Sequence, residues 1–182
     1  MGTQADLELA LWCSDAAAGL ALTYFDVGVE TTTKADGTPV TDADLAVEHL
    51  LRQMLASEVP NDALLGEEFG RLGDSERLWI LDPVDGTYFF SRGDPNWRVH
   101  IALEVAGNTE VAVVTAPALG CQWWATRGGG AFESSWPRNG NAKGLRVSRT
   151  VSLAGALLDA LDSESRDRLP LEATLAPPSP LA

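Results

Sequence analysis

The segment 79–90 reads WILDPVDGTYFF and places the strongest constraint on the fold of this 182-residue chain. An apolar, strand-like run ends at Asp82, and a second carboxylate, Asp85, follows three residues later, before a Gly-Thr pair. In α/β architectures such strand ends are where ligands collect, because the loops converge there while the sheet holds them in place. In an α/β architecture, the segment therefore predicts a ligand site at one edge of the sheet.

A second apolar run, ALLG, ends in the same way at Glu67 and Glu68. Taken alone, this pair is equally well explained as solvated turn residues or helix caps. Several carboxylates gathered in one low-dielectric pocket repel one another unless cations lie between them. Oxygen-rich clusters suit Mg²⁺, which keeps some of its water and is shared between carboxylates and a substrate phosphate. The two runs together predict a Mg²⁺ site that takes a phosphate.

The order of residues after the second run indicates how such a site is built. The proline between the two aspartates pushes Asp82 into an extended conformation, so a turn lets Asp82 and Asp85 face one metal ion with the Val84 carbonyl as a further ligand. Gly86 permits a close backbone approach. A helix that begins near Thr87 would direct its free N–H groups at a phosphate.

A different phosphatase chemistry has a similar signature. The haloacid dehalogenase family places D-x-D-G-T after an apolar strand, where a nucleophilic aspartate and an acid/base aspartate two residues later face one phosphorus. Here Asp82 and Asp85 are three residues apart. This spacing argues against an aspartyl-phosphate enzyme and favours water activated by a metal ion as the nucleophile.

The remaining sequence predicts helices followed by an antiparallel meander. Apolar spacing predicts an amphipathic helix from Asp6 to Phe25, and Thr41 or Asp42 caps a second helix. The runs RVHIALEV, EVAVVTA and CQWWAT then read as strands separated by the turns AGNT and PALG. GLRVS adds a short strand, and residues 153–161 are expected to form a helix.

Composition narrows the range of partners. The formal net charge is -13, and residues 1–90 hold 17 of the 26 acidic residues but 4 of the 13 Lys and Arg. Such an acidic half argues against a nucleic-acid surface, which needs clustered cations. No apolar stretch of 18 residues and no signal sequence are found, so we expect a cytoplasmic protein that spans no membrane. Cys13 and Cys121 are expected to be free thiols rather than a disulfide.

The motifs resemble those of the inositol monophosphatase family. The segment from Lys34 to Asp44, the Gly66-Glu67-Glu68 triplet and the segment 79–90 match its three N-terminal motifs in order. RGDPNW, VVTAPALGCQWWATRGGGAF and LRVS look most like the histidinol-phosphate phosphatases of actinobacteria. The resemblance implies an α/β fold, the N-terminal half of an αβαβα arrangement with two helices packed on a largely antiparallel sheet. It also implies a Mg²⁺-dependent phosphomonoesterase.

The resemblance further implies a role for each motif residue. The Mg²⁺ ligands would be Glu67, Asp82, the Val84 carbonyl and Asp85. The attacking water would be positioned and activated by Glu67, Thr87 and Asp44. The substrate phosphate would contact Asp85, Gly86 and Thr87. Lys34 and Glu68 would support the site, although Lys34 is equally well explained as an exposed turn residue. His49 and His100 are expected to be structural.

The chain departs from the family pattern at two places. Phe89 stands where the family has an asparagine, so a polar side chain that helps to fix the loop is lost. None of the six tryptophans is followed by aspartate, so the W-D-x-A-A motif, whose aspartate completes a second metal site, is absent.

The resemblance fades near Leu157, which predicts a phosphatase domain over 1–157 and a divergent, disordered tail over 158–182, as a frameshift or premature stop would produce. The implied substrate is a small phosphate monoester, histidinol phosphate in first place and inositol monophosphate, fructose bisphosphate or a nucleotide bisphosphate as alternatives. A cation-binding fragment without turnover is the other expectation. The family tendency implies a homodimer.

Overall fold

The computed structural model describes residues 3–28, 31–33, 39–152, 157–158 and 174–175. The chain divides into two compact units, Met1–Leu145 and Arg146–Ala182. The first unit contains both long helices and the main sheet, and the second contains one pair of two-residue strands among its described residues. All predicted site residues lie in the first unit, but Lys34 falls outside the described residues.

Two long helices form one layer of the first unit. Helix α1 spans Thr3–Val27, and helix α2 spans Asp42–Glu58. The predicted helix over residues 6–25 is therefore confirmed and extends two to three residues further at each end. Helix α2 begins after Thr41, as predicted, because the Asp44 carboxylate accepts hydrogen bonds from the Thr41 backbone N–H at 2.8 Å and from its hydroxyl at 2.5 Å.

The second layer is an eight-stranded sheet of order β10-β9-β8-β7-β6-β5-β3-β4. Every neighbouring pair is antiparallel except β3 and β5, which run parallel. The three strands of the predicted meander are present as β6, β7 and β8, and the short strand predicted at GLRVS overlaps β10 only at Gly144 and Leu145. Strand β9 continues the meander and was not predicted. The strands are β3 (Ala63–Gly66), β4 (Gly70–Leu72), β5 (Arg77–Asp85), β6 (Arg98–Val105), β7 (Asn108–Ala116), β8 (Cys121–Thr126), β9 (Gly130–Ser135) and β10 (Lys143–Leu145).

Short elements complete the first unit. Strands β1 (Thr31–Thr33) and β2 (Pro39–Thr41) pair antiparallel just before α2. A one-turn helix, α3, covers Thr87–Phe90 directly after β5, and a 3₁₀ turn covers Pro117–Leu119 between β7 and β8. No described helix is both long enough and apolar enough to cross a membrane.

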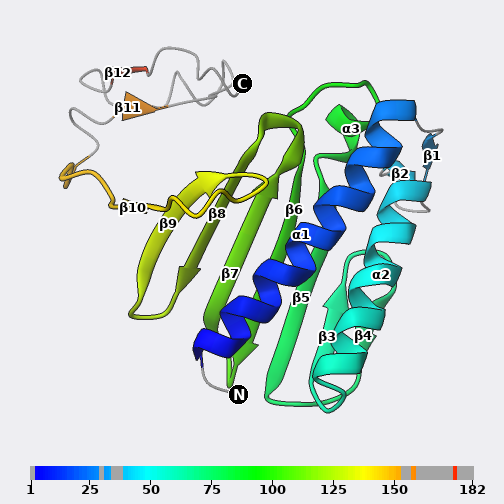
Figure 1. Ribbon diagram of the computed structural model, residues 1–182, viewed down its shortest axis with the longest axis horizontal. Coiled ribbons are helices and arrows are strands. Elements are labelled where there is room, and N and C mark those ends of the chain that lie inside the picture. The colour runs from blue at the N-terminus through cyan, green and yellow to red at the C-terminus, as the bar shows by residue number, and fades with distance from the viewer. Residues whose placement is uncertain (1–2, 29–30, 34–38, 153–156, 159–173, 176–182) are drawn as a thin grey trace. The chain divides into compact units, whose positions relative to one another are not determined.

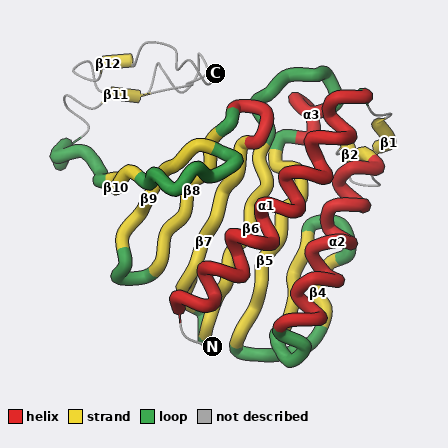
Figure 2. The backbone as a smooth tube through the Cα atoms, in the orientation of Figure 1, coloured by secondary structure: helices red, strands yellow, loops and turns green. Residues whose placement is uncertain are grey.

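Both long helices lie on the same face of the sheet (Figures 1 and 2). Alternate residues of the central strands point toward them, so Leu81, Ile101 and Val113 are almost fully buried. Trp79 and Trp97 are completely buried and add the largest side chains to this core. The two-layer arrangement fixes the sheet against the helices and leaves the ends of β3 and β5 as the places where the carboxylate-bearing loops emerge.

The opposite face of the sheet carries an apolar row that is more exposed than the core, in the part of the chain that is described. Leu65, Ile80, Ala102 and Ala112 are register neighbours across four strands. Leu65 is 36% exposed, and the other three are half-buried. An apolar row of this kind favours further packing against another surface.

The second unit corrects one prediction. Leu157–Leu158 (β11) and Thr174–Leu175 (β12) form a parallel pair, so the helix expected over 153–161 is wrong at its two described residues. The periodicity of a short apolar run does not distinguish a helix from a strand, which explains the error. Leu158, Thr174 and Leu175 are the described residues of the segment expected to be disordered, and all three lie in strands. The other residues of both predictions lie outside the described residues.

Candidate active site

The ends of strands β3 and β5 bring the two acidic runs together. The strands are parallel and in register from Ala63 opposite Leu78 to Gly66 opposite Leu81. The backbone N–H of Glu67 then donates a hydrogen bond to the carbonyl of Leu81 at 3.2 Å. Glu67 and Asp82 are therefore the next residues on two adjacent strands, which is the juxtaposition that the sequence predicted.

Asp82 is the most perturbed carboxylate of the site. Its Oδ1 atom is buried and has no hydrogen-bond partner. The pKa of Asp82 is raised to about 7, first by burial and then by the negative charges of Glu67 and Asp85 and a hydrogen bond with Glu67. An acceptor oxygen without a donor, surrounded by other carboxylates, has the chemistry of a ligand to a hard cation.

The turn after Asp82 contains an irregularity that separates the two aspartates. Asp82 lies opposite His100, whereas Asp85 lies opposite Arg98, so β5 has one residue more than β6 between these pairs. Such a bulge redirects side chains next to sites of function. Asp82 is half-buried as a result, while the Asp85 side chain is 52% exposed.

His100 lies beside Asp85 across this bulge. Its Nε2 atom is 3.6 Å from Asp85 Oδ2. Burial lowers the pKa of His100, and the Asp85 carboxylate opposes that effect. The sequence alone indicated a structural histidine, and the proximity to Asp85 was missed because it follows from the β5–β6 register. His49 is exposed on α2 and contacts Gln53.

Thr87 and Asp44 form the second half of the site. The Thr87 hydroxyl lies 3.1 Å from Asp44 Oδ1 and 3.1 Å from the Val84 carbonyl oxygen. Asp44 is completely buried, which raises its pKa, while hydrogen bonds from Thr41 and Thr87 act in the opposite direction. Asp44 therefore joins the start of α2 to the turn that follows β5.

Gly86 allows the backbone to make this turn. Its φ angle is +88°, and a Cβ atom at this position would lie 2.9 Å from the carbonyl oxygen of Asn96. Both features demand glycine. The helix predicted near Thr87 is present as α3, but it is only four residues long, so its dipole contributes little.

The carboxylates form a loose cluster rather than a closed metal cage. Among the residues that the structure describes, no three His, Cys, Asp or Glu side chains are close enough to surround a metal ion. The unpartnered oxygen of Asp82 and the hard-oxygen character of its neighbours nevertheless fit a divalent cation. The predicted ligands therefore lie at one edge of the sheet, but among the described residues they do not form a complete coordination shell.

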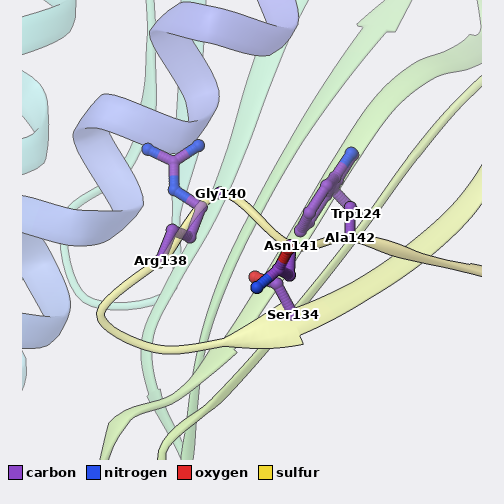
Figure 3. A pocket seen from close by; sticks show the side chains of 6 residues that line it. All are labelled: Trp124, Ser134, Arg138, Gly140, Asn141 and Ala142. Atoms are coloured by element: carbon purple, nitrogen blue, oxygen red, sulfur yellow. The ribbon is translucent and has the colours of Figure 1, made fainter.

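One cavity of the first unit lies away from the carboxylate cluster. It has a volume of about 360 Å³ and is lined by Trp124, Ser134, Arg138, Gly140, Asn141 and Ala142 (Figure 3). These residues belong to β8, β9 and the loop toward β10, three or four strands from β5, which is about 14–19 Å at ~4.8 Å per strand. Arg138 is already paired with Asp15 of α1 at 2.6 Å. This cavity contains none of the predicted site residues.

Comparison with protein families identifies one match. The sequence model described as "Inositol monophosphatase family" matches residues 5–178, a range that continues past residue 157.

Three curated proteins show how far the similarity extends. The histidinol-phosphatase of Mycobacterium tuberculosis is 50% identical over 131 residues, which cover 71% of this chain and 50% of that protein. The histidinol-phosphatase of Chlorobaculum parvum is 40% identical over 174 residues, which cover 93% and 67%. A Streptomyces griseus protein named glucose-1-phosphate thymidylyltransferase is 47% identical over 131 residues, which cover 71% and 51%.

A solved structure confirms the fold. The Thermotoga maritima IMPase superposes with a TM-score of 0.76 at 26% identity, and the match covers 93% of this chain and 65% of that one. The predicted class, a mixed α/β fold with two helices on a largely antiparallel sheet, is therefore confirmed. The chain spans between half and two thirds of the length of these four relatives.

Proposed function

Because the chain belongs to the inositol monophosphatase family, we propose that it binds Mg²⁺ at the ends of β3 and β5 and hydrolyses a small phosphate monoester there. The family is generally metal-dependent. The observation that carries the proposal is the buried Oδ1 atom of Asp82, which has no hydrogen-bond partner and lies in a carboxylate cluster with Glu67 and Asp85. A divalent cation is the group that best satisfies such an oxygen.

The predicted ligands are Glu67, Asp82, the Val84 carbonyl and Asp85. When bound, Mg²⁺ would neutralise charge on the phosphate and lower the pKa of a water molecule, so that this water could give its proton to a base as it attacks phosphorus. The Thr87 hydroxyl, held by Asp44 and the Val84 carbonyl, is placed to orient that water. Glu67 is the predicted base for that water, and Gly86 and Thr87 are predicted to present backbone N–H groups to the phosphate. Glu68 and Lys34 remain predicted supporting residues.

We propose histidinol phosphate as the first substrate to test, because two of the relatives are named histidinol-phosphatase. The thymidylyltransferase name of the third relative is not carried over, since the family match and the carboxylate cluster both support hydrolysis. Inositol monophosphate is the alternative substrate. The cytoplasmic location, the homodimer and the boundary at residue 157 remain predictions.

Phosphate release from histidinol phosphate tests the proposal. We expect release that depends on Mg²⁺, exceeds release from inositol 1-phosphate, and falls at least 100-fold in an Asp85→Asn variant. Release by the wild-type chain no faster than by this variant would contradict the catalytic function.

A second function has an observation of its own. A cation-binding chain without turnover is favoured by the loose carboxylate cluster, which offers oxygen ligands to a cation without a complete coordination shell among the described residues. Saturable Mg²⁺ binding combined with absent phosphate release would identify this second function.

A further inference from the structure

Glu48 of helix α2 is a buried carboxylate that the proposed function does not use. Its side chain is completely buried. Glu48 Oε2 accepts a hydrogen bond from the backbone N–H of Glu68 at 2.7 Å, and Oε1 accepts one from that of Phe69 at 3.1 Å. These are the two residues that directly follow Glu67. A charged acceptor on two backbone N–H groups is among the stronger hydrogen-bonding arrangements in proteins.

Arg52, one helical turn further along α2, completes the attachment. Its Nε atom donates to Glu48 Oε1 at 2.7 Å, and its Nη2 atom bonds to the carbonyl of Gly70. The Arg52 side chain is only 13% exposed in this pair. The turn between β3 and β4 is therefore held to α2 through the backbones of Glu68, Phe69 and Gly70.

Gly66 shows how closely the strand approaches this carboxylate. A Cβ atom on Gly66 would lie 1.9 Å from Glu48 Oε1, which is far too close for two atoms that are not bonded to each other. The glycine is thus required by the space that Glu48 occupies, immediately before Glu67.

The same face of α2 also reaches the other half of the site. Asp44 and Glu48 are four residues apart and so lie one above the other on the helix. Asp44 bonds to Thr87 after β5, and Glu48 bonds to the turn after β3. One helix face therefore fixes both loops that carry the predicted ligands.

We propose that Glu48 is a positioning residue that holds the turn bearing Glu67 against Asp82, and that metal affinity depends on it. This inference rests on the proposed cation site. It assigns to Glu48 no contact with metal or substrate. A purely structural carboxylate would instead stabilise the fold and leave metal affinity unchanged.

Asp62 provides the matched control. It lies just before β3, at the opposite end of that strand from Gly66, and its side chain is 9% exposed. Its carboxylate accepts hydrogen bonds from the side chains of Arg77 and Trp79. Asp62→Asn therefore disturbs a similarly buried carboxylate about 13 Å along the strand, at ~3.3 Å per residue.

The experiment compares Glu48→Gln, Gly66→Ala and Asp62→Asn with the wild type, below the melting temperature of each. Glu48→Gln replaces one carboxylate oxygen, an acceptor, with an amide NH₂ group. Gly66→Ala displaces the Glu48 carboxylate but leaves its charge in place. Amide hydrogen exchange is measured on metal-free protein, and the Kd for Mg²⁺ is measured by calorimetry. We expect Glu48→Gln and Gly66→Ala to speed exchange at Glu68 and Phe69 at least 10-fold and to raise the Kd at least 10-fold. Asp62→Asn should lower Tm only.

The proposal would be overturned if Glu48→Gln and Gly66→Ala gave the same exchange rates at Glu68 and Phe69, and the same Kd for Mg²⁺, as Asp62→Asn. If the wild type binds no Mg²⁺, the proposed function fails and the dependence of metal affinity on Glu48 fails with it. Faster exchange with an unchanged Kd would also contradict the inference while leaving the proposed function standing.

Discussion

The Thr87 hydroxyl lies 3.1 Å from Asp44 Oδ1, which joins the turn after β5 to the start of α2 across 43 residues of sequence. Asp44 is completely buried, and its other oxygen bonds to Thr41. A carboxylate in this position needs its donors, because a buried acceptor that loses one costs about 1–3 kcal/mol. The pair therefore couples stability to the geometry of the proposed site.

Thr87→Val tests this coupling. The substitution keeps the shape of the side chain but removes the donor to Asp44, so we expect the free energy of unfolding to fall by about 1–3 kcal/mol. We also expect Mg²⁺-dependent phosphate release to fall at least 10-fold, because the hydroxyl orients the attacking water. Thr87→Ser is the control that keeps the hydroxyl. Equal release rates for the Val and Ser variants would remove Thr87 from the mechanism.

The two cysteines should react at very different rates. Cys13 is completely buried and Cys121 half-buried, and both are free thiols, as the sequence predicted. Burial, reinforced by the charge of Glu58, raises the pKa of Cys13 to about 12. The raised pKa means that the folded protein favours the neutral Cys13 thiol. The stability that depends on this neutral thiol is fully present below about pH 9 and is lost as the pH rises toward 12.

Labelling with a thiol-specific reagent at pH 8 measures the difference. We expect one thiol to react rapidly and the other only as fast as the protein opens, since the thiolate is the reactive form. A Cys121→Ser variant should lose the rapid phase alone. Rapid labelling of Cys13 in that variant would show that α1 is not packed as described.

Arg77 fastens the start of β5 to two other elements. Its guanidinium pairs with Asp6 of α1 at 2.7 Å and with Asp62 before β3 at 3.0 Å. These hydrogen bonds and charges raise the pKa of Arg77, led by the hydrogen bond with Asp6. The network lies at the end of β5 far from Asp85.

Arg77→Met should therefore destabilise the fold without touching the site. Removing one partner from a buried ion pair costs about 3–5 kcal/mol because the remaining carboxylates stay unpaired, and the partial exposure of Arg77 places the loss at the lower end. Denaturant unfolding measures it, and the Kd for Mg²⁺ should not change. A tenfold weaker Kd would show that the two ends of β5 are coupled.

The sequence predicted those parts of the site that depend on local order along the chain. The spacing of Asp82 and Asp85 and their shared sheet edge with Glu67 follow from two apolar runs that end in acids. The start of α2 follows from the cap predicted at Thr41 or Asp42. Each of these features lies within one element or in two neighbouring parallel strands.

The features that the sequence did not predict depend on contacts between distant segments. His100 reaches Asp85 only through the register of β5 and β6 and the bulge between them. Glu48 reaches the turn after β3 across 20 residues, and its helix position gives no sign of this contact. Leu157 and Leu158 form a strand because Thr174 and Leu175 pair with them, which no local pattern in residues 153–161 indicates.

The central claim is that Asp82, whose buried Oδ1 atom has no hydrogen-bond partner, is a cation ligand. Titration of the wild-type chain and of Asp82→Asn with Mg²⁺ in a calorimeter tests it most directly, with unfolding curves recorded for both. The account predicts saturable binding by the wild type and at least a 10-fold weaker Kd for the variant. Because burial and neighbouring charges disfavour the ionised Asp82, the metal-free variant should be at least as stable as the wild type. Equal Mg²⁺ affinity of the two proteins would contradict the account.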